Sequence, residues 1–151
     1  MKLTEEPEIV TWPETHYVFV EKTGPFAKIA PEAWQTAISL VPLLKEHNQV
    51  TGHMSLYKMS PNVYRAGFVL PEPPVKLPAE LKYEKFAGGV YSKFVLTGPY
   101  SEMSQASGRV WEIVSKNGIM VRADFAIENY VNDPNTTPEE KLVTEILVPT
   151  A

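Results

Sequence analysis

The sequence has 151 residues, of which 14 are basic and 18 are acidic, and its formal net charge is -4. Recognition of nucleic-acid phosphates needs clustered Lys and Arg, which this chain lacks, so we expect no nucleic-acid partner. The absence of cysteine excludes disulfides, thiolate nucleophiles and iron–sulfur clusters. With 44% hydrophobic residues, a chain of this length is expected to fold as one globular domain over residues 1–151.

The sequence carries no sign of export, membrane insertion or a bound cofactor. Its first ten residues, MKLTEEPEIV, lack the apolar core of a secretory signal, and no stretch approaches the ~20 apolar residues of a membrane span. His16, His47 and His53 do not have metal-ligand spacing, and there is no glycine-rich phosphate loop. We therefore expect a cytoplasmic protein that uses no metal or cofactor and does not contact a membrane.

The first half of the chain is predicted to follow the order strand, helix, strand, strand. Alternating aromatic and β-branched residues predict the strands, and Gly24-Pro25 ends the first of them. Pro31 suits the first turn of the helix, and Pro42 should kink or end it. In chain order, these elements are a strand at 16–23, a helix at about 31–47, and strands at about 51–58 and 63–70.

The second half repeats this order after a proline-rich connector at about 71–80. Ser101 is a suitable N-cap for the second helix, and Asn117-Gly118 is a suitable stop. In chain order, these elements are a strand at 90–97, a helix at about 101–117, and strands at about 121–131 and 142–148.

Sequence matches between the halves indicate an internal duplication. Tyr17 to Phe26 aligns with Tyr91 to Tyr100, and Tyr57 aligns with Tyr130. The repeats then cover about 8–71 and 82–149. Two such units predict an α+β fold: one antiparallel sheet with two helices on one face and a ligand groove on the other.

Strand alternation predicts which side chains line that groove. Phe125 and Ile127 are expected in the core, which leaves Glu128 and Tyr130 on the opposite face together with Glu145. In the first half, the same alternation places Ser55, Tyr57, Gly67 and Val69 on the groove face, with Met54 and Leu56 inward. Phe68 and Phe94 are also assigned to the core.

Several segments resemble the GyrI-like domains, also known as the effector-binding domains of bacterial transcription activators. The most specific are Ile127 to Pro134, Thr136 to Glu140 and Thr144 to Pro149, and Gly88 to Tyr91 with Thr97 to Tyr100 resembles the family's middle motif. The resemblance covers about residues 8–149. Because residues 1–15 are too few for a DNA-binding segment, the chain resembles a stand-alone member rather than a regulator.

The resemblance implies a groove between the two halves that binds lipophilic, often cationic aromatic compounds, with aromatic walls and a central glutamate. Glu128 matches that glutamate and Tyr130 matches the tyrosine beside it. We expect ligand contacts from Glu128, Glu145, Tyr130, Tyr57, Tyr17, Tyr91, Trp111 and Ser55.

The resemblance leaves a second function open, because stand-alone members include drug-binding proteins, a gyrase inhibitor and hydrolases of cyclopropane-bearing genotoxins. In a hydrolase, Glu128 would activate water, and Tyr130 or Tyr57 would donate a proton to the leaving oxygen. The ligand, the oligomeric state and any topoisomerase partner stay open at this point.

Overall fold

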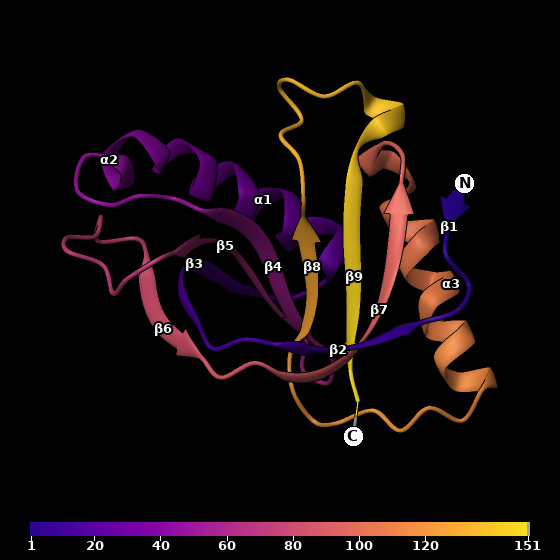
Figure 1. The fold of residues 1–151 in the computed structure, drawn as a ribbon. Helices are drawn as coiled ribbons and strands as arrows, with labels where there is room; N and C mark the ends of the chain where they lie inside the picture. The colour runs from indigo at the N-terminus through magenta and orange to yellow at the C-terminus, as the bar shows by residue number, and fades with distance from the viewer. Residues whose placement is uncertain (151) are drawn as a thin grey trace. The chain divides into compact units, whose positions relative to one another are not determined.

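Two compact units make up the chain in a computed structural model that describes residues 1–150. Named by their positions in the sequence, the central unit spans residues 13–88, and the outer unit combines residues 1–12 with residues 89–150. Each unit contains antiparallel strands and a long helix (Figure 1). The prediction of an α+β fold is therefore confirmed.

The central unit has four strands in the order β4-β5-β3-β6, all antiparallel. The helix α1 packs against β3 and β5. The bounds of its elements are β3 Thr15–Thr23, α1 Phe26–Ser39, α2 Val41–Lys45, β4 Gly52–Lys58, β5 Val63–Leu70 and β6 Lys82–Phe86.

The outer unit has the order β7-β9-β8, and both β1 and β2 pair with the remaining edge of β7. All of these pairs are antiparallel. The bounds of its elements are β1 Lys2–Leu3, β2 Glu8–Trp12, β7 Gly89–Thr97, a 3-10 turn Tyr100–Glu102, α3 Met103–Lys116, β8 Ala126–Tyr130, a second 3-10 turn Glu139–Lys141 and β9 Val143–Pro149.

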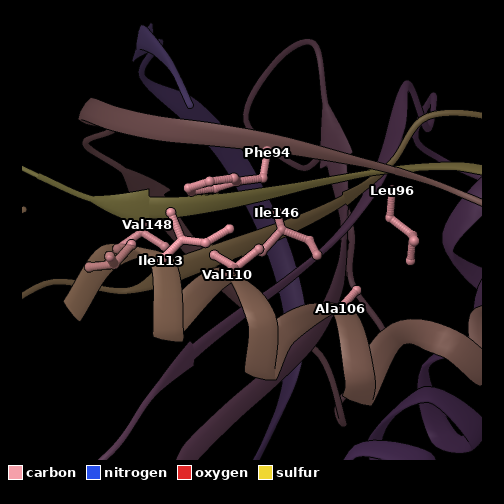
Figure 2. Close-up of a cluster of buried hydrophobic side chains, with 8 residues drawn as sticks. Phe94, Leu96, Ala106, Val110, Ile113, Ile146 and Val148 are labelled. Atoms are coloured by element: carbon pink, nitrogen blue, oxygen red, sulfur yellow. The ribbon is translucent and has the colours of Figure 1, made fainter. Parts of the chain in front are cut away.

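The helix α3 covers one face of the outer sheet and forms a hydrophobic core with it. Phe94, Ile146 and Val148 extend from β7 and β9 toward Val110 and Ile113 of α3, and all five are buried (Figure 2). Burying each such side chain contributes about 1.5–3 kcal/mol relative to exposure, so this row fixes the helix on that face.

The first helix begins five residues earlier than predicted. Gly24 adopts φ 134°, and the carbonyl of Pro25 accepts bonds from the N–H groups of Lys28 and Ile29, so α1 starts at Phe26 and Pro31 lies inside it. The predicted break at Pro42 is confirmed, because α1 ends at Ser39 and Pro42 occupies the first turn of α2.

Two further predictions were wrong in their details. Ser101 lies within a 3-10 turn and does not cap α3. The strand predicted at 121–131 is confined to Ala126–Tyr130, and Val121 forms only an isolated bridge with Thr150. The edge strands β1, β2 and β6 were not predicted. The charged sequence KYEKF of β6 is exposed at four of its five positions, which removes the alternation that marks a half-buried strand.

The helices among residues 1–150 are too short or too polar to cross a lipid bilayer. The cytoplasmic location remains a prediction.

Candidate functional site

The strand register places Glu128 on the face that α3 covers. Glu128 lies opposite Ile146, and Ile146 lies opposite Phe94 in the next strand. Residues directly opposite each other in an antiparallel pair point to the same face, so Glu128 shares the face of the hydrophobic core. The predicted placement of Glu128 on the face away from the helix is therefore wrong.

Glu145 lies on the other face, because its partner across the strands is Asn129. The prediction that Glu128 and Glu145 share a face is wrong, since their positions differ by one step in the register. On that face the negative charge of Glu145 is stabilised by two neighbours: Asn129 Nδ2 donates to Oε1 at 2.8 Å, and Lys93 Nζ lies 3.4 Å from Oε2. The hydrogen bond with Glu8 and the charge of Glu145 raise the pKa of Lys93 against the effect of desolvation.

Glu128 is a buried carboxyl group, with 9% of its surface exposed. Tyr130, two residues along the same strand and hence on the same face, donates its hydroxyl to Glu128 Oε1 at 3.0 Å. Desolvation raises the pKa of Glu128 above its usual value, and the hydrogen bond from Tyr130 opposes that shift in part. A neutral phenol is thus the hydrogen-bond partner of a group that would carry a full negative charge when ionised.

Two residues that the sequence did not single out lie beside this pair. The Tyr100 ring meets the Tyr130 ring edge-on, with centroids 5.5 Å apart, and burial raises the pKa of Tyr100, assisted by the charge of Asp133. Thr144 lies opposite Tyr130, and its buried hydroxyl has no hydrogen-bond partner within residues 1–150. In the sequence, Tyr100 belongs to the segment Thr97 to Tyr100, and nothing in its spacing indicates proximity to Glu128.

The four tyrosines predicted to line one groove divide into two pairs. Tyr17 and Tyr91 are fully buried on the sheet faces opposite the helices, and their hydroxyls donate to backbone carbonyls. Tyr17 bonds Met54 O at 2.8 Å, and Tyr91 bonds Phe125 O at 2.8 Å. Burial raises the pKa of both phenols, so they remain neutral hydrogen-bond donors in the fold.

In the central unit, Ser55 and Tyr57 lie on the face that α1 covers. Trp34 of α1 donates its indole N–H to Ser55 Oγ and to the Tyr64 hydroxyl, both at 2.9 Å, and these two oxygens are 2.7 Å apart. Met54 and Gly67 face the opposite way, so the predicted sharing of a face by Gly67 and Ser55 is wrong. The roles of Trp34 and Tyr64 were missed, because aromatic residues at these spacings are usually core.

The other residues predicted for the site or the core differ in how deeply they are buried. Trp111 is half-buried and packs against the hydrophobic core of α3, and the predicted core residues Phe68 and Phe94 are fully buried. Phe125 is only half-buried. Within residues 1–150, no cluster of three or more His, Asp or Glu side chains could hold a metal ion.

Comparison with solved structures identifies the same fold in several proteins. The C-terminal domain of EcmrR has a TM-score of 0.79 at 15% identity, covering 100% of this chain and 99% of that domain. SAV2435 bound to tetraphenylphosphonium has a TM-score of 0.73 at 17% identity, covering 97% and 94%. A hydrolase from Listeria innocua has a TM-score of 0.65 at 14% identity, covering 98% and 93%.

No protein with a curated description matches the sequence. The family model of the GyrI-like small molecule binding domain matches residues 5–151, which is nearly the whole chain. This match agrees with the resemblance carried by the segments around Glu128 and Tyr100. The chain belongs to the GyrI-like small-molecule-binding domains.

Proposed function

We propose that the protein binds lipophilic aromatic cations, with the Glu128 carboxylate as their counter-charge and Tyr130 and Tyr100 as aromatic contacts. The observation that carries this proposal is a buried carboxyl group whose hydrogen-bond partner is a neutral phenol. Sequestration of toxic compounds and sensing of them both require this binding step.

The electrostatics of Glu128 favour a cation over a neutral ligand. Ionising a buried carboxyl without a positive partner is unfavourable, which is why the pKa of Glu128 is raised. A bound cation restores the favourable electrostatic environment that the carboxylate loses on burial. The faces of Tyr130 and Tyr100 also attract cations through their π electrons, which contributes about 0.5–2 kcal/mol per contact.

Tyr17, Tyr91 and Glu145 are left out of the proposed site. The two tyrosines use their hydroxyls to bond the backbone on the opposite face, and Glu145 is compensated by Lys93 and Asn129. Ser55, Tyr57 and Trp111 stay predictions as ligand contacts.

The similarity to SAV2435 guides the choice of probe. That protein was solved with tetraphenylphosphonium, a lipophilic aromatic cation. At 17% identity the likeness extends to the fold alone, so binding by this chain has to be measured.

The test is a fluorescence titration with rhodamine 6G and competition by tetraphenylphosphonium. Wild type should bind both, and Glu128→Gln should weaken binding by about 5- to 150-fold, equivalent to about 1–3 kcal/mol for loss of a buried charged partner. Glu145→Gln is the matched control, because it removes the same charge on the opposite face, and its affinity should stay within about twofold. Equal cation affinity in wild type and Glu128→Gln would contradict the proposal.

A hydrolase is the second candidate function, favoured by the raised pKa of Glu128 and its contact with a phenol. When ionised, Glu128 can accept a proton from water as the water oxygen bonds to a carbon of the strained ring. Tyr130 then donates its proton to the oxygen that receives the electron pair of the broken ring bond, and the proton on Glu128 returns to Tyr130. Incubation with a cyclopropane-bearing alkylator, followed by chromatography, tests this function. Turnover that survives both Glu128→Gln and Tyr130→Phe would exclude this mechanism.

A further inference from the structure

A surface cavity of about 310 Å³ lies in the outer unit, at the end of α3 away from Tyr100. Its lining residues are Ile9, Ser92, Ile119, Met120 and Thr150. Pockets that hold small organic ligands start at about 300 Å³, so this volume suits a compact molecule.

The hydrophobic core of α3 lies between this cavity and the Tyr100–Tyr130 contact beside Glu128. Figure 2 shows Val148 and Ile113 at one end of the buried row, and Leu96 and Ala106 at the other. Ser92 lies opposite Val148 and thus extends the first end, where Ile119 follows the helix. The Tyr100–Tyr130 contact lies where α3 begins, and a helix of 14 residues is about 20 Å long.

The floor of the cavity is polar and firmly held. Ser92 and Thr150 are buried, and Ser92 Oγ donates to Thr150 Oγ1 at 3.3 Å. Because Ser92 Oγ donates this bond and Ser92 is fully enclosed, the group left for a ligand is the hydroxyl of Thr150, which keeps its own hydrogen and has 4% of its surface exposed. Thr150 is fixed because its N–H donates to Val90 O at 3.1 Å and its carbonyl accepts from Arg122 Nη1 at 2.6 Å.

The walls are apolar, and none of the five lining residues is charged. Ile9 and Met120 expose 66% and 76% of their surfaces, which is unfavourable in water unless something covers them. Covering apolar surface contributes roughly 25 cal/mol per Å², and the flexible Met120 side chain can adapt to the shape of a ligand.

We infer that this cavity is a second small-molecule site, for an uncharged ligand with an apolar body and one hydrogen-bonding group. This cavity favours an uncharged ligand, whereas Glu128 favours a cation, because a charged ligand would find no counter-charge among the residues that line the cavity. The protein would then bind a neutral and a cationic compound at different ends of α3.

The test is titration of the protein with N-phenyl-1-naphthylamine, a neutral dye with one N–H group whose fluorescence rises in apolar surroundings. Met120→Glu places a charge at the cavity and should weaken dye binding at least tenfold. Val75→Glu is the matched control, because Val75 is 79% exposed and does not line the cavity. Ser92→Ala combined with Thr150→Val removes the polar floor and should weaken binding by about three- to tenfold.

Independence from the cation site is measured in the same titration. Glu128→Gln and saturating tetraphenylphosphonium should both leave the dye affinity unchanged. Dye binding that Met120→Glu and the double variant leave intact would overturn the inference, as would complete displacement of the dye by tetraphenylphosphonium. Absence of dye binding together with a wild-type dimer that Met120→Glu dissociates would show instead that a second copy of the chain covers this surface.

Discussion

The two units carry different chemical groups at equivalent positions of two strands that correspond to each other in the repeats. Ser55 in β4 and Glu128 in β8 each precede, by two residues, the tyrosines that align between the repeats, and each lies on the helix-covered face of its sheet. Ser55 is held by Trp34 and Tyr64, whereas Glu128 is hydrogen-bonded by Tyr130. Hydrogen bonds from neighbouring side chains are enough to satisfy a buried neutral hydroxyl. A buried carboxylate also loses the solvation of its negative charge, and a bound cation can offset that cost.

The opposite faces of the two units differ as well. The last strands of the two repeats align from Arg65 to Pro71 and from Val143 to Pro149, so Gly67 of the central unit corresponds to Glu145 of the outer unit. Tyr17 and Phe19 lie against Gly67, so that face is closed and aromatic, and Arg65 stacks over the Phe19 ring at 4.3 Å. The outer unit carries Lys93 and Glu145 there, which form a partly exposed ion pair.

The largest expected effect comes from Gly67→Ala, which breaks the closed face of the central unit. An added Cβ would overlap the Val18 carbonyl oxygen and lie 2.8 Å from Tyr17 Cζ. Overpacking of this kind typically costs 1–3 kcal/mol and more when backbone must move, so we expect a loss of about 3 kcal/mol in the free energy of unfolding. Urea denaturation measures it. Glu145→Ala, at the aligned position, should cost less than about 1 kcal/mol.

A smaller effect is expected from Ser55→Ala, because it removes the hydroxyl that Trp34 and Tyr64 share. The loss should be about 1–2 kcal/mol, because Ser55 makes one hydrogen bond with each of these residues, while Trp34 keeps its bond to the Tyr64 hydroxyl. A double-mutant cycle with Trp34→Phe should show coupling of about 1 kcal/mol. Additive losses from the two substitutions would mean that the hydrogen-bonded cluster does not stabilise the central unit.

Glu128→Gln should have the opposite sign and raise stability at neutral pH. A folded-state pKa above the unfolded value means that the folded protein holds the proton more tightly, so wild-type stability falls as pH rises through that pKa. The gain should be about 1.4 kcal/mol for each unit by which the pKa is raised, and it should vanish below about pH 4, where both states are protonated. Urea denaturation at several pH values measures this gain. A Glu128→Gln variant that is less stable at pH 7 would show that the ionised carboxylate is well compensated.

The sequence indicates the repeated order of strands and helix because aromatic and β-branched alternation and the two Gly-Pro corners are local signals. The starts of both helices were misplaced, since Pro31 and Ser101 have strong terminal preferences that the turns after Gly24 and Gly98 override. The strands β2 and β6 were missed because they are edge strands without clear alternation.

Two residues of the candidate site are in contact as a pair, but the face on which they lie was predicted wrongly. Glu128 and Tyr130 were chosen from the motif, and their hydrogen bond is present. Their face was predicted wrongly because alternation fixes a face only relative to the pairing register, and pairing is a long-range property. The contributions of Tyr100 and Thr144 depend on contacts across the fold and left no local pattern.

The most direct test of the account is the pKa of the Glu128 carboxyl, followed by NMR of protein labelled with 13C at glutamate side chains. The account predicts a pKa above the ordinary value in the free protein, and a clear fall when tetraphenylphosphonium is bound, because a cation stabilises the ionised form. The Glu145 resonance provides the internal control and should titrate alike with and without the cation. A Glu128 titration that saturating tetraphenylphosphonium leaves unchanged would contradict its role as the counter-charge.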